Sequence, residues 1–150
     1  MDPKSKAPRD TLGPTPVGAQ GVLEGLPQSL DPLLRAHRIQ ERVAGVGFDW
    51  DEPDGALEKI REELLEVEAA LRNEGVDALE GEIGDLLFSV VNLARMVGLH
   101  GSVALERANV KFEARFRELA KLAQGRSIPI PGASLEELDK LWDEVKDRDR

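Results

Sequence analysis

The stretch over residues 60–92 constrains this chain most, because it places pairs of acidic residues three positions apart on two predicted helices. Glu63 and Glu66 form the first pair, and Glu82 and Asp85 form the second. Residues at positions i and i+3 share one helix face. Two such helices packed together could direct four carboxylates at one point, and hard divalent cations, Mg²⁺ above all, bind such oxygen clusters.

The sequence over residues 83–99 supports this interpretation, because it is apolar at nearly every position. A helix that is apolar on all sides is usually buried. The polar residues Glu82, Asp85, Ser89 and Asn92 step by three and four along one narrow stripe of this helix. Unpaired carboxylates in such surroundings would be costly or would be protonated. We therefore expect a buried helix whose acidic stripe is neutralised by a bound metal ion.

Acidic pairs also arise by chance, because 29 of the 150 residues are Asp or Glu. Glu136 and Asp139 have the same spacing on a helix with a clear solvent side, where we expect an ordinary solvated face. The apolar surroundings of Glu82 and Asp85 favour the opposite interpretation for that pair.

Composition narrows the class of protein. A chain of 150 residues suits one domain, and its scarce aromatic residues, with no Tyr, favour helices over sheet. A net charge of −9 argues against binding to a nucleic acid polymer, which needs clustered Lys and Arg. The sequence has no Cys, no apolar run of membrane-span length and no signal peptide, so we expect a cytoplasmic protein without membrane contacts.

The order of Pro, Gly and capping residues predicts an all-α fold of four to five helices. Residues 1–28 are predicted to form a flexible, Pro- and Gly-rich tail, and residues 29–150 a folded domain. The predicted helices span Pro32–Ala44 behind the N-cap Asp31, 54–73 with Asp54 as N-cap, 77–97 with a capping box of Asp77 and Glu80, 103–124 behind Ser102, and a last helix with a capping box of Ser134 and Glu137. We expect the charged tail, residues 146–150, to fray.

Several side chains outside the acidic pairs also receive a prediction. Phe48 and Trp50 are expected to anchor the loop between the first two helices in the core, and His100 to be solvated. In the fourth helix, the residues expected to pack inward are Leu105, Phe112, Phe116 and Leu119.

The residue types present point to metal-dependent chemistry on phosphates. Neither His lies in a recognisable triad setting, and no P-loop motif occurs. All-oxygen ligation indicates Mg²⁺ or Mn²⁺, and such metals bridge phosphate oxygens. Glu62 or Glu63 could accept the proton of an attacking water, while Lys111 and Arg115, with Asn109 close by, could hold further phosphate oxygens. These residues predict a metal-dependent hydrolase of phosphoanhydrides.

The acidic pattern and its flanks resemble the MazG family of all-α nucleoside triphosphate pyrophosphohydrolases. The family pattern E-E-x-x-E, a spacer and E-x-x-D is present as Glu62-Glu-Leu-Leu-Glu66, fifteen residues, then Glu82-Ile-Gly-Asp85. The segments GEIGDLLFSVVNLAR and RANVKFEARF are especially similar to the C-terminal domain of two-domain members. The resemblance covers about residues 22–146.

The resemblance implies Mg²⁺-dependent hydrolysis of nucleoside triphosphates (NTP or dNTP) to the monophosphate and pyrophosphate, by a homodimer that pairs its helices across subunits. Mn²⁺ is a possible substitute. Carried over by position, the metal ligands are Glu63, Glu66, Glu82 and Asp85, and the basic residues at the triphosphate are Lys59, Lys111 and Arg115. Trp142 matches an aromatic residue near the nucleotide, although packing within the last helix explains it equally well.

Two departures from the family pattern leave alternatives open. Longer members carry two such domains, whereas this chain has one, and Ala114 stands where relatives often have Arg. One alternative is an enzyme with narrow specificity for dUTP or a modified nucleotide. The other is a helical dimerisation or regulatory module without catalytic activity, against which the intact acidic set argues.

Overall fold

The computed structural model describes residues 18–73 and 75–150, and the part of the predicted tail before residue 18 lies outside them. The described residues form a short 3-10 helix, η1 (Ala19–Gly21), and five α-helices: α1 (Pro32–Ala44), α2 (Pro53–Asn73), α3 (Val76–Met96), α4 (Gly101–Gly125) and α5 (Leu135–Arg148). They contain no strand. The prediction of an all-α fold with four to five helices is confirmed.

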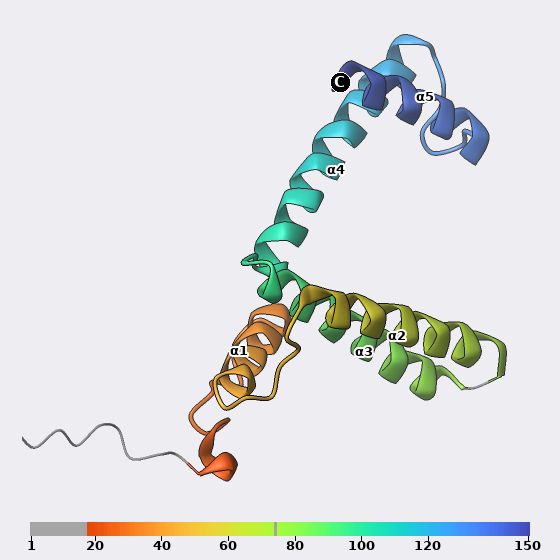
Figure 1. Cartoon of the computed structure of the whole chain (residues 1–150). Helices are drawn as coiled ribbons and strands as arrows, with labels where there is room; N and C mark the ends of the chain where they lie inside the picture. Colours follow the sequence, from red (N-terminus) through yellow and green to blue (C-terminus); the bar gives the residue numbers. More distant parts are fainter. Residues whose placement is uncertain (1–17, 74) are drawn as a thin grey trace, which may run out of the picture.

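The helices form two packed regions joined by α4 (Figure 1). At one end, α2 and α3 pack as an antiparallel hairpin, and α1 packs against α3. Helix α4 turns away from α3 at 104° and carries α5 at its far end. There, α4 and α5 bury a small core of Leu119, Ala123, Leu141 and Val145. Among the described helices, α5 contacts α4 alone.

Two predicted helix starts are confirmed in atomic detail. The carboxylate of Asp31 accepts hydrogen bonds from the backbone N–H groups of Leu33 at 3.0 Å and Leu34 at 3.3 Å, with Pro32 as the first helical residue. Ser134 and Glu137 form the predicted capping box of α5. Such caps satisfy N–H groups that have no partner inside the helix.

Three other predicted caps are wrong, because each helix begins earlier than its capping residue. Helix α2 starts at Pro53, so Asp54 lies within its first turn. Helix α3 starts at Val76 behind Gly75 without a side-chain cap, which removes the predicted box of Asp77 and Glu80. Helix α4 starts at Gly101 behind the N-cap His100, so Ser102 is helical. Asp54 and Asp77 lie in the first turns of their helices, where an acid still interacts favourably with the helix dipole. An acid near a helix start is therefore expected both at the N-cap and in the first turn.

The C-terminal end is also more ordered than predicted. Helix α5 continues to Arg148, whereas we expected residues 146–150 to fray. The next residue, Asp149, accepts a hydrogen bond from Nε of Arg115 on α4 at 2.8 Å. This ion pair ties the end of α5 to the neighbouring helix.

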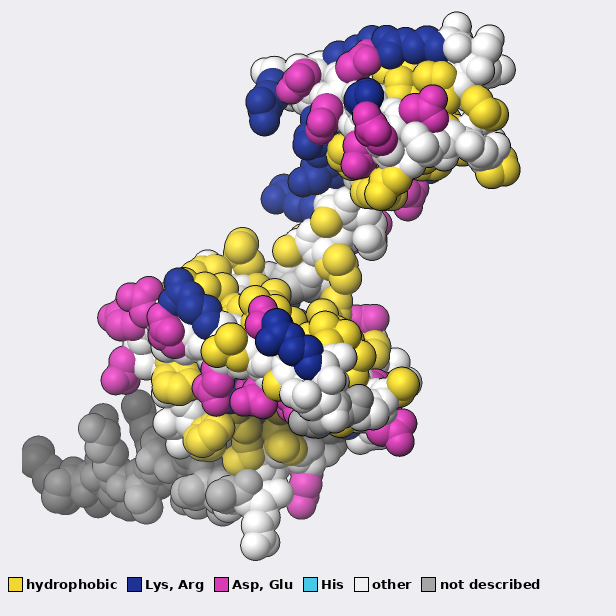
Figure 2. Space-filling model, turned by 90° about the vertical axis from the view of Figure 1, so that its right-hand side faces the viewer, with side chains coloured by type: hydrophobic (Ala, Val, Ile, Leu, Met, Phe, Trp, Pro, Cys, Tyr) yellow, Lys and Arg dark blue, Asp and Glu magenta, His cyan; other side chains and the backbone are white. Residues whose placement is uncertain are grey.

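The prediction that α3 is buried on all sides is wrong for the single chain. Ile83, Leu87, Val90 and Val97 are each more than two-fifths exposed, because the contacts with α1, α2 and α4 leave part of this surface uncovered. Helix α4 is similar, since Leu119 is buried while Leu105, Phe112 and Phe116 are exposed. Figure 2 shows hydrophobic side chains exposed over the lower body and around the narrow segment above it. The apolar helix surfaces therefore lack a partner within the described chain.

Of two loop predictions, the one for Phe48 and Trp50 is wrong, and the one for His100 is confirmed because His100 is exposed. Phe48 is 80% exposed and does not enter the core, and the half-exposed Trp50 lies on the first turn of α2 at Gly55. His100 is exposed, but its ring stacks on that of His37 in α1, with centroids 4.1 Å apart. These contacts arise from the path of the loops between helices, which helical periodicity does not report.

Within the described residues, no single helix is both long and apolar enough to cross a membrane. Helices α3 and α4 meet that test of length and composition only when taken together as a bent pair.

Candidate active site

The hairpin of α2 and α3 brings three of the four predicted metal ligands together. Carboxylate oxygens of Glu63, Glu82 and Asp85 all lie within 4.8 Å of one another. Glu63 is 7% exposed, Glu82 is half-buried and Asp85 is exposed. The cluster is therefore buried at Glu63 and open to solvent at Asp85, where a ligand could approach.

Glu63 is buried because it lies on the face of α2 that packs against α3. Ala56 and Ala70, seven residues before and after it, are the other buried residues of α2. Residues seven apart lie almost directly above one another on a helix. The small alanines let the two helices approach closely, and Glu63 is the polar side chain at the middle of that contact.

Lys59 places a cation against this cluster. Its Nζ lies 2.5 Å from Glu63 and 3.2 Å from Glu62, one turn along the same helix. Hydrogen bonds to Glu63 and then to Glu62 raise the pKa of Lys59 above its ordinary value. Lys59 thus stays charged and partly neutralises the acidic face.

Glu66, the fourth predicted ligand, is exposed and lies outside the group of three. Glu62, the other candidate for a catalytic base, is exposed beside the cluster with its carboxylate held by Lys59. Of the three acids in E-E-x-x-E, Glu63 is therefore buried in the contact between the helices, whereas Glu62 and Glu66 are exposed.

The remaining predicted substrate contacts lie on the α4–α5 arm, away from the acidic cluster of the same chain. Within the described residues, α2 makes no contact with α4 or α5. Arg115 bonds to Asp149, and the ring of Trp142 lies 5.0 Å from that of Phe112. The others, Asn109 and Lys111, are exposed along α4.

Sequence reasoning missed a pocket between α1, the loop after it and α3. Its volume is about 360 Å³, and its walls include Phe48, Trp50, Phe88, Asn92 and Arg95. The available signal was the sequence Phe-Asp-Trp at residues 48–50, which we assigned to core packing. An aromatic pair around an acid is equally suited to a partly open binding site.

The donor set of the acidic cluster fits a hard divalent cation. All three side chains offer oxygen, and three ionised carboxylates at this separation repel one another unless positive charge lies among them. Because one member is buried, water screens that repulsion incompletely. The fold and the cluster together define an all-α protein with a carboxylate site on a helix hairpin, suited to a divalent cation.

Comparison with known proteins identifies a domain within the chain. Residues 52–121 match the family described as "MazG nucleotide pyrophosphohydrolase domain". These residues contain α2, α3, the acidic cluster and most of α4. The chain therefore carries a MazG domain over these residues.

Curated relatives match over a longer part of the chain. It is 44% identical over 127 residues to the "Nucleoside triphosphate pyrophosphohydrolase" of Escherichia coli K12, a match that covers 83% of this chain and 48% of the relative. It is 41% identical over 117 residues to the "Nucleoside triphosphate pyrophosphohydrolase/pyrophosphatase MazG" of Thermotoga maritima, covering 78% of this chain and 45% of the relative. The chain thus spans about half the length of these relatives.

Proposed function

We propose that this protein hydrolyses nucleoside triphosphates to nucleoside monophosphate and pyrophosphate, with Mg²⁺ as cofactor. The observation that carries the proposal is the convergence of Glu63, Glu82 and Asp85 inside the segment that matches the MazG domain. The names of the E. coli and T. maritima relatives support the reaction, since each describes a nucleoside triphosphate pyrophosphohydrolase. Control of the nucleotide pool is the role we propose for it.

Glu63, Glu82 and Asp85 would hold Mg²⁺, or Mn²⁺ in its place, and Glu66 is the further ligand that the family pattern adds. The metal would supply positive charge to the phosphate oxygens and favour ionisation of water. Glu62, exposed beside the cluster, is the proposed acceptor for the proton of the attacking water, and Glu63 is the alternative. The water oxygen forms a bond to the α-phosphorus, the bond from that phosphorus to the bridging oxygen breaks, and pyrophosphate leaves.

The active unit in this proposal is a homodimer. Lys111, Arg115 and Trp142 cannot reach the acidic cluster of their own chain as described, because α2 contacts neither α4 nor α5. The exposed apolar faces of α3 and α4 offer a surface that a second copy could cover. We therefore propose that the α4–α5 arm of one subunit supplies Asn109, Lys111, Arg115 and Trp142 to the nucleotide held by the other.

The first experiment identifies the products formed from each common NTP and dNTP in the presence of Mg²⁺. Monophosphate and pyrophosphate are expected, with loss of both on addition of EDTA. Glu82→Gln and Asp85→Asn should each lower kcat by roughly a hundredfold or more, because each would remove a charged ligand of the metal.

Glu136→Gln and Asp139→Asn form the matched control, since this pair has the same spacing on the exposed face of α5. They should leave turnover unchanged, and far-UV circular dichroism should show the same helix content in all four variants. Release of diphosphate and orthophosphate would contradict the proposed reaction. Turnover of dUTP or a modified nucleotide alone would support a narrow-specificity enzyme, and no turnover of any nucleotide would favour the non-catalytic module.

A further inference from the structure

We propose that the elbow between α3 and α4 responds to pH: the stacked rings of His37 and His100 hold the α4–α5 arm in place near neutral pH and release it in mild acid. The elbow is the turn over residues 97–100, where α4 leaves α3 at 104°. His37 lies in α1, and His100 is the N-cap of α4. Their contact therefore joins the start of the arm to a helix that is distant in sequence.

A small group of contacts at the elbow sets the direction of the arm. Gly98 has a φ of +76°, which residues other than glycine rarely adopt, so the chain can turn sharply there. Gly101, the first residue of α4, lies so close to α3 that a Cβ atom on it would be 3.2 Å from Cγ2 of Val91. Helix α4 packs far less extensively on α1 and α3 than α2 packs on α3. The stack of His37 on His100 is thus one of the few contacts that can fix the angle of the arm.

His37 is suited to this role as a neutral ring. It is 5% exposed, and its ring centroid lies 4.1 Å from that of His100, with 23° between the ring planes. Its Nε2 lies 3.4 Å from the carboxylate of Glu41, whereas its Nδ1 is buried without a hydrogen-bond partner among the described residues. A neutral ring with its proton on Nε2 fits these surroundings, because Nδ1 then carries no hydrogen. Protonation would place a buried N–H on Nδ1 without an acceptor, which is costly.

The charged groups of α1 and α4 around His37 also disfavour its protonation on balance. Burial and then His100 lower the pKa of His37, and Arg38 on the same helix acts in the same direction. Glu41 opposes them, but its carboxylate is also bonded to Arg38 at 2.9 Å. A carboxylate that already faces one cation stabilises a second cation less than a free carboxylate would.

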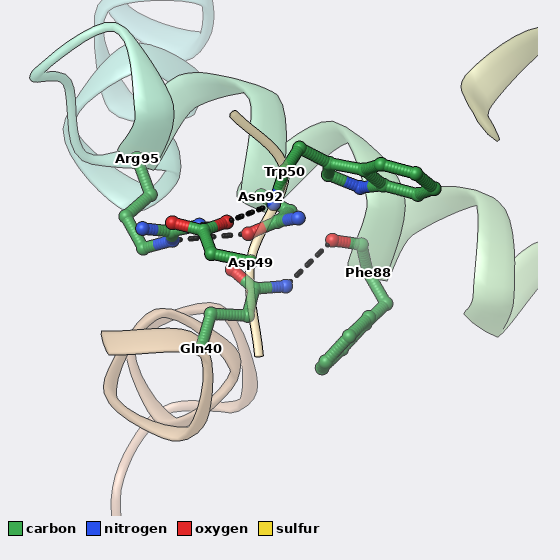
Figure 3. Close-up of polar contacts among 6 residues, drawn as sticks. All are labelled: Gln40, Asp49, Trp50, Phe88, Asn92 and Arg95. Carbon is green, nitrogen blue, oxygen red and sulfur yellow. Dashed lines mark hydrogen bonds and ion pairs between the residues drawn. The ribbon is translucent and has the colours of Figure 1, made fainter. Parts of the chain in front are cut away.

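Helix α3, which also packs on α1, presents a cation that is already paired. The guanidinium of Arg95 bonds to Asp49 at 2.6 Å and to Oδ1 of Asn92 at 3.0 Å (Figure 3). Arg95 lowers the pKa of the Asp49 carboxyl, so this pair keeps its charges in mild acid. Gln40 on α1 donates a hydrogen bond to the backbone carbonyl of Phe88 at 2.8 Å (Figure 3). These bonds keep α1 on α3, and acid therefore acts on the contact between α1 and α4.

The direction of the pH effect follows from the two settings of His37. With the elbow closed, the pKa of His37 lies below its ordinary value of 6.5, and with the elbow open the ring reaches water and the pKa returns toward that value. Between these two pKa values the open form binds more protons, so the equilibrium shifts toward it as the pH falls below 6.5. A second proton, on the exposed His100, would add repulsion between the stacked rings.

The consequence for activity rests on the proposed function. There the arm carries Lys111, Arg115 and Trp142 to the nucleotide of the other subunit, while the acidic cluster stays on the hairpin of α2 and α3. Release of the arm would therefore weaken the hold on the nucleotide and leave the acidic cluster in place. The expected result is a rise in the KM for nucleoside triphosphates in mild acid.

The first test measures the elbow itself and needs no turnover. The chain has no Cys, so Glu68→Cys on α2 and Glu113→Cys on α4 provide two exposed sites for spin labels. Labelled chains are refolded with an excess of unlabelled protein, so that each distance measured by double electron–electron resonance lies within one chain. One narrow distance is expected at pH 7.5, and loss of that narrow peak to a broad distribution at pH 5.5. A narrow peak at both pH values would overturn the inference.

A variant without histidine tests whether the imidazole rings are responsible. His37→Phe combined with His100→Phe keeps two aromatic rings at the elbow and removes both histidines of the chain. Its distances should not change between pH 7.5 and 5.5. A change with pH that persisted in this variant would assign the effect to carboxylates and would overturn the inference.

Glu41→Gln tests the same point with both histidines in place. It removes the charge that favours protonated His37 in the closed form, so the elbow should open more than in the wild type at pH 5.5. Glu118→Gln is the matched control, because Glu118 on α4 pairs with a cation three residues away, as Glu41 does, and should match the wild type. Opening in Glu41→Gln no greater than in the wild type would contradict the role of His37.

The ratio of the KM at pH 5.5 to the KM at pH 7.5 extends the test to activity. This ratio should be several-fold larger in the wild type than in the variant without histidine, because titration of the substrate affects both proteins equally. Equal ratios would overturn the consequence for activity. If the wild type turned over no nucleotide, the proposed function would fail, and the distances would still decide whether the elbow responds to pH. An elbow that stayed closed at pH 5.5 in an active protein would overturn this inference alone.

Discussion

His37 illustrates how a single side chain can acquire an unusual setting in this fold. It is 5% exposed, its ring stacks on His100, and its Nε2 lies 3.4 Å from Glu41. Burial and then the neighbouring His100 lower the pKa of His37 below its ordinary value of 6.5, and Arg38 acts in the same direction. Glu41 opposes them without reversing the shift.

This lowered pKa predicts that the protein loses stability in mild acid. Between its folded and unfolded pKa values His37 binds more protons in the unfolded chain, so its contribution is present above pH 6.5 and is lost as the pH falls. The free energy of unfolding, measured in urea, should therefore fall between pH 7.5 and 5.5 in the wild type and fall less in His37→Gln. His100→Gln removes the effect of His100 on the pKa of His37 but leaves His37 buried. This variant should therefore keep part of the loss of stability in acid. Equal slopes in the wild type and His37→Gln would contradict this account.

Individual residues of the candidate site were predictable to different degrees. Glu63, Glu82 and Asp85 were found because their spacing repeats the helical period, and the structure brings them together. Glu66 has the same spacing but lies outside the group, because its position on α2 faces away from the middle of the helix contact. Spacing reports which residues share a helix face, and only the rotation of that face toward its neighbour selects among them.

At the scale of helices, the start of α5 is set by a local signal that can be tested. Ser134 accepts a hydrogen bond from the N–H of Glu137 at 3.2 Å, and the Glu137 carboxylate accepts from the N–H of Ser134 at 2.9 Å. Ser134→Ala should reduce the free energy of unfolding by about 1 kcal/mol, because it leaves an N–H at the helix end without its partner.

Ser102→Ala is the matched control, since the sequence predicts a cap there and the structure places Ser102 inside α4. Urea unfolding monitored by circular dichroism should show little change for Ser102→Ala. A loss as large as that of Ser134→Ala would mean that α4 begins after Ser102, as the sequence predicted.

The apolar patterns of α3 and α4 predicted buried helix faces, whereas much of these faces is exposed in the described chain. Leu87 and Phe116 are both about half exposed. Hydrophobicity reports that a face favours burial, and it contains no information on which chain covers it. The same limit applied to Phe48, whose size suggested the core although it is almost fully exposed.

At the scale of the whole molecule, the separation of the α4–α5 arm from the acidic cluster predicts complementation between defective subunits. Glu82→Gln removes a proposed metal ligand from the acidic cluster, and Arg115→Ala removes a proposed phosphate contact from the α4–α5 arm. Each variant alone should be nearly inactive. In a mixed dimer, one of the two sites combines an intact cluster with an intact arm.

Random pairing after unfolding and refolding a 1:1 mixture should restore about a quarter of the wild-type activity, because half of the dimers are mixed and each has one intact site. Mixing Glu82→Gln with Asp85→Asn is the matched control and should restore nothing, since both changes affect the same end of the site. Light scattering of the wild type checks the dimer directly. A monomeric active enzyme would contradict the arrangement.

The sequence by itself determined what depends on near neighbours along the chain: the helices, the caps of α1 and α5, and the acidic pairs three residues apart. These follow from the helical period and from hydrogen bonds between residues a few positions apart. The tertiary structure alone decided which faces meet. The crossing of α2 and α3 brings Glu63 to Glu82 and Asp85, and the loop after α1 places Trp50 beside Asn92. The turn of α4 carries Arg115 away from both, because the direction of a helix depends on packing between distant segments.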